Sequence, residues 1–240
     1  MSHILKTPSV VNGIHPNRSG NGIDGRYFFL AIIAWILSAC AEGLPAASKN
    51  GNMHLKRDNL ELVVEMKPGE DILSVFYLVR NRNNSPLFLF NILHERPGPG
   101  GVYEIDEGGY VEIGTNETVI SKKQLALPFG VLVESKVVPF VTRVPPGGEF
   151  KETFKIPLPL SQKVYYEDPE AEQADRQSKS VPMKLRFELG YFFGKPGTDE
   201  LAKWYATSKG NVMGFNPFPI SSQKIISVGP FPAVPVIRPR

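Results

Sequence analysis

The sequence is poor in the residues that build covalent or metal-based sites. Of its 240 residues, only Cys40 is a cysteine and only four are histidines. A single cysteine excludes an internal disulfide, a four-cysteine zinc site and a paired CxxC redox motif. The HExxH motif, the GxSxG nucleophile elbow and the glycine patterns of nucleotide-binding loops are also missing. We therefore expect no catalytic residue, no metal site and no cofactor.

The chain also lacks an excess of charge of one sign. It carries 27 basic and 24 acidic side chains, and the basic ones form no dense stripe along the sequence. Binding to nucleic acid depends on clustered Lys and Arg that neutralise phosphates. We therefore do not expect nucleic acid as a partner.

No apolar run is long enough to cross a bilayer, which takes about 20 residues. The longest run, Tyr27 to Leu37, has 11 residues and follows an arginine. A short run of this kind is typical of the hydrophobic region of a secretory signal peptide. A retained membrane span would have to tolerate Glu42 and Pro45. The sequence predicts that residues 1–39 are a signal peptide that is removed.

The apolar run ends in the sequence Leu37, Ser38, Ala39 and Cys40. A branched apolar residue, two small residues and a cysteine in this order resemble the lipobox of bacterial lipoproteins. The resemblance implies that Cys40 receives a thioether-linked diacylglycerol, that the chain is cut before it, and that the new amino group is acylated, as with palmitate. Since each buried CH₂ contributes about 0.8 kcal/mol, several acyl chains on one residue give stable attachment to a membrane.

The residue after the cysteine is Ala41 rather than aspartate. In lipoproteins of enteric-type bacteria, this implies sorting to the outer membrane, with the protein facing the periplasm or the cell surface. The alternative is ordinary secretory cleavage after the small triplet Ala39–Ala41, which would release a soluble secreted or periplasmic protein.

The part of the chain after the cysteine favours a β fold. Residues 40–57 are small and polar, and we expect a flexible tether there. Residues 58–229 hold short runs rich in β-branched and aromatic residues, divided by many of the 22 glycines and 22 prolines. This spacing predicts a mainly β, immunoglobulin-like antiparallel β-sandwich. The motifs NxxNxPLFLFN and PPGGEF are weakly similar to immunoglobulin-like domains of bacterial secreted proteins.

Three segments depart from this strand pattern. Residues 161–180 are rich in acidic side chains, and we expect an exposed insertion there. Residues 198–208 begin with a capping threonine and two acidic residues, which predicts one short helix near the C-terminus. Residues 230–240 hold several prolines, and we expect a proline-rich tail.

Four aromatic residues are the best candidates for contacts with a ligand or partner. Tyr165 and Tyr166 border the acidic insertion, whereas Trp204 and Tyr205 lie on the predicted helix. Adjacent residues of a helix do not face the same side, so one of the latter pair is expected to be exposed. Exposed aromatic side chains stack on sugars or form the centres of protein interfaces.

The sequence thus favours a lipid-anchored protein of the cell envelope, with a non-enzymatic binding or structural role and an envelope protein as its partner. A carbohydrate-binding or peptidoglycan-binding module is an alternative, because of the aromatic residues. A third interpretation is an envelope hydrolase with an unrecognised carboxylate site, which the missing catalytic motifs disfavour.

Overall fold

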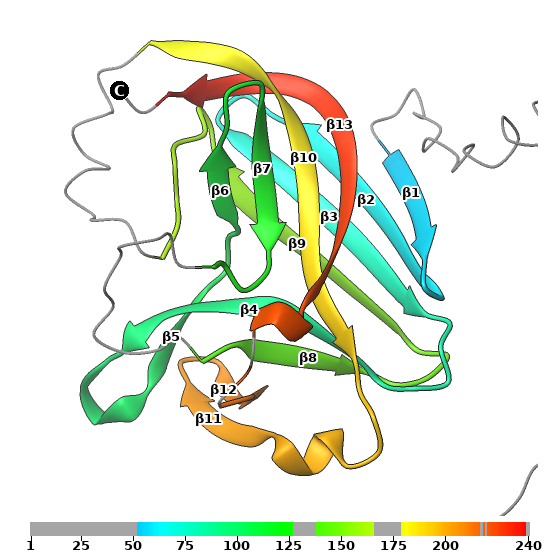
Figure 1. The fold of residues 1–240 in the computed structure, drawn as a ribbon. Coiled ribbons are helices and arrows are strands. Elements are labelled where there is room, and N and C mark those ends of the chain that lie inside the picture. Colours follow the sequence, from blue (N-terminus) through cyan, green and yellow to red (C-terminus); the bar gives the residue numbers. More distant parts are fainter. Residues whose placement is uncertain (1–51, 127–137, 166–178, 217, 219, 239–240) are drawn as a thin grey trace, which may run out of the picture. The chain divides into compact units, whose positions relative to one another are not determined.

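The computed structural model describes residues 52–126, 138–165, 179–216, 218 and 220–238, and these residues form a mainly β fold (Figure 1). The strands are β1 Asn52–Arg57, β2 Leu60–Pro68, β3 Ile72–Asn81, β4 Leu87–Pro97, β5 Tyr103–Asp106, β6 Tyr110–Ile113, β7 Glu117–Lys122, β8 Phe140–Val144, β9 Glu149–Pro157, β10 Ser180–Phe193, β11 Lys203–Thr207, β12 Gly210–Gly214 and β13 Lys224–Ile237. Within these ranges, no helix is long and apolar enough to span a membrane.

The strands form two sheets. The smaller sheet has four antiparallel strands in the order β1-β2-β3-β9. The larger sheet has nine strands and is organised around the long strand β10, which pairs antiparallel with β13 and β4 and parallel with β7. Strand β9 is therefore an edge of the smaller sheet, with β3 as its neighbour on one side.

The inner faces of both sheets share one apolar core. In β2 the inward-facing Leu60, Leu62, Val64 and Met66 alternate with outward-facing residues that are mostly polar, as expected for a strand with one face buried. The same alternation in β10 buries Leu185, Phe187, Leu189 and Tyr191. The Tyr77 ring of the smaller sheet lies 5.3 Å from the Phe187 ring of the larger one. The two sheets are thus stabilised together, because each fully buried large apolar side chain contributes roughly 1.5–3 kcal/mol.

The prediction of a helix at residues 198–208 is wrong. The helical elements of the described ranges are short 3-10 turns, namely η1 Pro99–Gly101, η3 Thr198–Leu201 and η4 Ile220–Ser222. Residues after η3 form the hairpin of β11 and β12. An isolated helix of this length has little stability of its own, whereas in the hairpin the Tyr205 ring packs 5.2 Å from that of Phe140. Gly210, with a φ of 102°, makes the tight turn that closes the hairpin.

The expected tether is shorter than predicted. Its last residues form β1, which pairs along its whole length with β2 and buries Met53. Asp58 and Asn59 make the connecting turn with positive φ angles of 52° and 62°, a conformation that these two residue types tolerate better than most. Residues 40–51 lie outside the described residues.

The prediction of a proline-rich tail at residues 230–240 is also wrong, because β13 continues through residue 237. Among the described strands β13 pairs only with β10, so it lies at a sheet edge where prolines are tolerated, and Leu160 adds an isolated bridge to Val236. Phe231, Val234 and Val236 are buried in the core. These apolar residues, rather than the prolines between them, decide the structure of the segment.

The expected insertion at residues 161–180 begins later than predicted. Lys163 exchanges two backbone hydrogen bonds of 2.9 Å with Val111, and Val164 is buried. Residue 180 already belongs to β10. Residues 166–178 lie outside the described residues.

Candidate functional site

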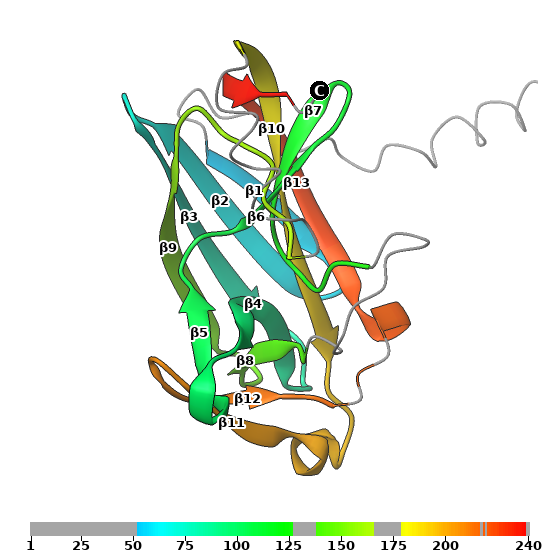
Figure 2. The same ribbon diagram turned by 90° about the vertical axis from the view of Figure 1, so that its left-hand side faces the viewer.

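A polar cavity of about 440 Å³ lies along the edge strand β9. Ligand sites commonly have volumes of roughly 300–1,000 Å³. Four consecutive residues of β9, Glu152–Lys155, line the cavity. Because consecutive side chains of a strand point to opposite faces, the cavity follows the edge of β9 rather than one face. In Figure 2, β9 and β5 follow one another along the left-hand edge of the ribbon. The other lining residues are Asn91, Ile92, Ile105, Asp106, Glu107, Lys122 and Lys209.

A buried ion pair forms part of the cavity wall. The Lys122 ammonium lies 3.0 Å from the Glu152 carboxylate, and the two side chains are 2% and 23% exposed. The same ammonium stands 4.9 Å from the centre of the Phe154 ring, a distance at which a cation is attracted to the ring face. Burying a charge without a partner is costly, so each member of this pair holds the other in the wall.

Two neutral side chains complete the shell around Glu152. The Tyr77 hydroxyl donates a hydrogen bond to Glu152 Oε2, and Asn91 Nδ2 donates to the same oxygen over 3.2 Å. Burial raises the pKa of Tyr77 well above its usual value, and the nearby charge of Glu152 raises it further. Tyr77 is therefore a permanent donor at neutral pH, and Glu152 accepts hydrogen bonds from three different side chains.

Asn91, a residue of the cavity lining, has one buried polar atom without a partner among the described residues. The residue is 5% exposed, and its Oδ1 atom accepts no hydrogen bond from any described residue. The orientation of this amide follows from chemistry, since only its nitrogen can donate to the Glu152 carboxylate. An unsatisfied buried acceptor costs about 1–3 kcal/mol. Next to the cavity, Asn91 thus keeps a buried acceptor that no described side chain or backbone group satisfies.

The rim of the cavity carries charges of both signs. Asp106 pairs with Lys163 over 2.8 Å, and Glu107 pairs with Lys209. Lys155 has no ion-pair partner among the described residues, and it is exposed. The lining holds three positive and three negative side chains, and Lys155 is the one cation among them without an ion pair to a described residue.

The sequence contains a signal for this site that periodicity alone did not reveal. Phe150, Phe154 and Ile156 of β9 face inward, and Glu152 stands among them at a core-facing position of an edge strand. Lys122 ends β7 in a run of three buried residues. A charged residue at a core-facing position requires a partner, but the sequence does not tell which lysine supplies it.

The structure separates the four aromatic residues named from the sequence. The Tyr165 hydroxyl donates to the backbone oxygen of Leu125 over 2.9 Å, and its ring packs 5.9 Å from that of Tyr110. Tyr205 packs on Phe140 in a different cluster, whereas Trp204 is 67% exposed. Tyr166 lies outside the described residues, and so do the lipobox residues Leu37, Ser38, Ala39 and Cys40. Trp204 is thus the one described member that is available at the surface.

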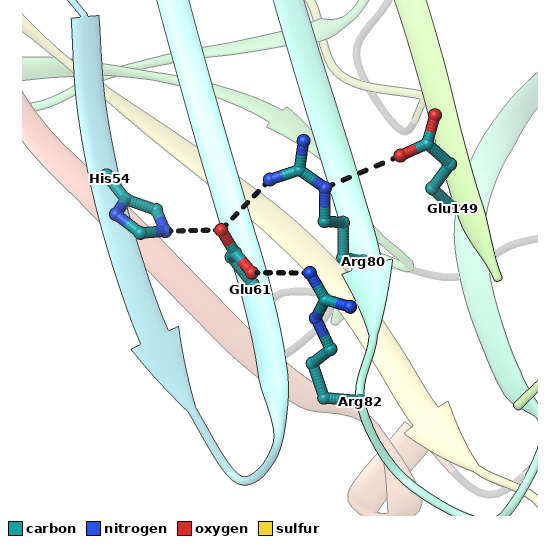
Figure 3. Close-up of polar contacts among 5 residues, drawn as sticks. All are labelled: His54, Glu61, Arg80, Arg82 and Glu149. Atoms are coloured by element: carbon teal, nitrogen blue, oxygen red, sulfur yellow. Dashed lines mark hydrogen bonds and ion pairs between the residues drawn. The ribbon is translucent and has the colours of Figure 1, made fainter. Parts of the chain in front are cut away.

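A charge network on the outer face of the smaller sheet has a structural role (Figure 3). Glu61 lies 2.9 Å from His54, 3.0 Å from Arg80 and 3.5 Å from Arg82, and Arg80 also contacts Glu149 over 3.4 Å. Burial opposes ionisation of Glu61, but the hydrogen bond and charge of Arg80, together with the charges of Lys56 and His54, outweigh it and hold the pKa of the carboxyl below its usual value. The network joins all four strands of the sheet.

Among the residues that the structure describes, no cluster of three or more His, Cys, Asp or Glu side chains is arranged to hold a metal ion. Comparisons of the chain with family models, with curated proteins and with solved structures find no match.

Proposed function

We propose that this chain is a lipid-anchored protein of the bacterial cell envelope whose β-rich domain binds a small polar ligand in the cavity beside β9. The observation that carries the binding role is the cavity wall, where a buried ion pair and a buried amide with an unpartnered oxygen meet. Interiors rarely keep such groups without a reason, because apolar residues would stabilise the fold at least as well.

The membrane anchor rests on the sequence Leu37-Ser38-Ala39-Cys40 after an apolar run of signal-peptide length. In this proposal Cys40 is acylated and attaches the protein to the outer membrane, and the polar residues that follow separate the lipid from the domain. Anchoring keeps the domain close to one membrane, which raises the effective concentration of any ligand or partner held there.

The proposed role is binding rather than catalysis. Glu152 already accepts hydrogen bonds from Lys122, Tyr77 and Asn91. A general base needs a free lone pair within reach of the proton that it removes. Since the carboxylate of the cavity wall is engaged by these donors, it serves to fix the shape of the wall.

The proposal also includes the type of fold. Two mainly antiparallel sheets that share one core support an immunoglobulin-like sandwich, the architecture that the turn spacing predicts. The parallel pairing of β7 with β10 is an addition to the pattern of such sandwiches. A binding site at a sheet edge suits this architecture, since its rigid core holds the edge strand in place.

The anchor is tested by replacing Cys40 with serine in the full chain. We expect Cys40→Ser to leave the detergent-extracted membrane fraction and appear as an unprocessed or soluble form, whereas the control Ser48→Ala fractionates as the wild type. If Cys40→Ser stays in the membrane fraction in the same amount and with the same mobility as the wild type, the anchor is refuted.

A second candidate function is binding of glycan or peptidoglycan at the surface of β11. The observation that favours it is the 67% exposure of Trp204, since exposed indole rings stack on sugar faces. This function predicts that Trp204→Ala loses retention on cell-wall polysaccharide. Unchanged retention of the folded variant would exclude it.

A further inference from the structure

We propose that the outer face of the smaller sheet docks on an anionic lipid surface, that of the membrane to which Cys40 is attached. This inference goes beyond the cavity, and it rests on the lipid anchor of the proposed function. Three features of the chain support it: the unpaired charges of the face, its apolar centre, and the short link between Cys40 and the sheet.

The acidic side chains of the outer face are already neutralised. The outward-facing positions of β1, β2, β3 and β9 hold three carboxylates. Glu61 and Glu149 both contact Arg80, over 3.0 Å and 3.4 Å (Figure 3). Glu65 contacts Lys67 over 2.8 Å. The negative charges of this face are therefore all engaged by neighbouring cations.

Three lysines of the same face lack such a partner. Lys56 stands on β1, whereas Lys151 and Lys155 stand on β9, and these two strands are the edges of the sheet. All three side chains are exposed, and none has an ion pair to a described residue. Three strand spacings of about 4.8 Å separate the two edges. The unpaired charge of the face is thus entirely positive and lies along both edges.

A strip of apolar side chains lies between these edges. Val63 of β2 stands opposite Leu78 of β3, and Phe76 and Ile72 follow on the same side of β3. The first three are partly exposed, and Ile72 is 43% exposed. Surfaces that lie in a membrane interface combine apolar area with basic residues that attract anionic lipids. A lysine can also lay its stem along apolar surface while its ammonium stays in water. The outer face has both components.

Charge complementarity favours a lipid surface over a second copy of this chain. A symmetric contact between two copies would join the same patch of each, and the unpaired lysines would then face one another. Like charges at an interface disfavour such a contact. An anionic lipid surface instead attracts these lysines, and each one close to it strengthens binding about 5-fold.

The link to Cys40 keeps this face close to the membrane. Asn52, the first described residue, begins β1 at the edge of the sheet. Residues 41–51 allow a separation from Cys40 of at most about 40 Å, whatever their conformation. A tether of this length gives an effective concentration on the order of mM. A modest attraction by three lysines is therefore sufficient for docking.

The test is the protection of lysines from acetylation in the acylated chain reconstituted on vesicles. The vesicles contain phosphatidylcholine alone, or phosphatidylcholine with phosphatidylglycerol as about one lipid in three. Acetic anhydride, a neutral reagent, is added, and peptide mass spectrometry gives the rate at each lysine. With phosphatidylglycerol, we expect Lys56, Lys151 and Lys155 to react at least about 5-fold more slowly than without it. Lys195 and Lys203, which are exposed outside this sheet, should react alike on both, and high salt should remove the difference.

Two matched double variants locate the docking. Lys151→Gln/Lys155→Gln is expected to remove the protection of Lys56 at the opposite edge, whereas Lys195→Gln/Lys203→Gln is expected to keep it. All four positions are exposed, and changes at such positions usually alter stability little. Protection of Lys56 that survives the first double variant would overturn the inference.

Flotation with phosphatidylcholine vesicles reports the anchor separately from the docking. Equal acetylation rates on both kinds of vesicle, for a chain that floats, would overturn the docking and leave the anchor intact. A chain that does not float would overturn the anchor, and the docking with it. Protection in isolated outer membranes but not on vesicles with phosphatidylglycerol would also overturn the docking on lipid, and would assign the face to an acidic protein.

Discussion

Lys122 and Glu152 come from different sheets and meet in an ion pair of 3.0 Å beside a cavity. Strand β7 of the larger sheet supplies the ammonium, and edge strand β9 of the smaller sheet supplies the carboxylate. The pair therefore links the two sheets through charge next to their apolar core. Because the amide of Asn91 and the hydroxyl of Tyr77 point to the same carboxylate, four side chains fix the shape of the wall.

Removal of the ammonium is expected to destabilise the fold. Lys122→Met leaves the Glu152 carboxylate partly buried without its partner, and breaking a buried pair costs about 3–5 kcal/mol. Since Glu152 is 23% exposed, we expect the free energy of unfolding, measured by urea denaturation, to fall by an amount near the lower end of this range, about 3 kcal/mol. The double variant Lys122→Met/Glu152→Gln removes both charges and should recover more than half of the loss. A loss below about 1 kcal/mol for Lys122→Met would show that the pair is unimportant for stability.

The Tyr77 hydroxyl should make the fold sensitive to alkali. Burial and the charge of Glu152 raise the pKa of Tyr77, so the folded chain keeps its proton while the unfolded chain loses it at pH values above about 10. The contribution of this group is therefore complete below pH 10 and is lost as the pH rises further. Tyr77→Phe should lower stability by about 1.5–3 kcal/mol at neutral pH through the lost hydrogen bond. The variant should also show a shallower fall between pH 9 and 11, measured by urea denaturation, and an identical slope would contradict this account.

Glu61 should make the fold sensitive to acid. Its pKa in the folded chain is lowered, because Arg80, Lys56 and His54 together outweigh the effect of burial. Its contribution is therefore present above its usual pKa of about 4.5 and is lost as the pH falls through the lower folded value. Glu61→Gln should be about 2 kcal/mol less stable than the wild type at pH 7, and this difference should shrink below pH 4.

The control for this prediction is Glu70→Gln, at an exposed position of the β2–β3 turn. Surface changes of this kind usually stay within about 0.5 kcal/mol of the wild type. A difference between Glu61→Gln and the wild type that stays constant from pH 7 to pH 3 would mean that the charge of Glu61 is not what stabilises the network.

The sequence predicted that the chain is rich in strands better than it predicted where individual segments begin and end. Residues 58–229 were expected to hold strands, and in β10 the alternation of Leu185, Phe187 and Leu189 with charged residues follows from one face of that strand lying on the core. The prediction failed where pairing decides the structure, as in the hairpin of β11 and β12. There, local capping signals favoured a helix, but pairing with β12 and the packing of Tyr205 determined the conformation.

The candidate site was harder to predict than the fold. Tyr165 was selected because aromatic residues suit ligands, yet its ring completes a small cluster with Tyr110. Asn91, Lys122 and Glu152 lie far apart in the sequence and meet only because β4, β7 and β9 converge. A local sequence pattern cannot predict contacts between strands that are distant in the sequence. The one local indication of this site is the charged residue Glu152 on an otherwise apolar face of β9.

The central claim, a ligand-binding cavity on a lipid-anchored chain, is tested most directly by the reactivity of a cysteine placed at its entrance. The chain has no cysteine besides Cys40, which is blocked if it carries a thioether-linked lipid. Thr153→Cys and, as its control, Thr115→Cys are reacted with a small maleimide in the presence of single sugars, amino acids, dicarboxylates and polyamines. The account predicts that the wild type does not react, and that at least one compound slows Thr153→Cys severalfold without slowing Thr115→Cys. A reactive wild type would contradict the anchor, and a Thr153→Cys rate that no compound changes would contradict the binding site.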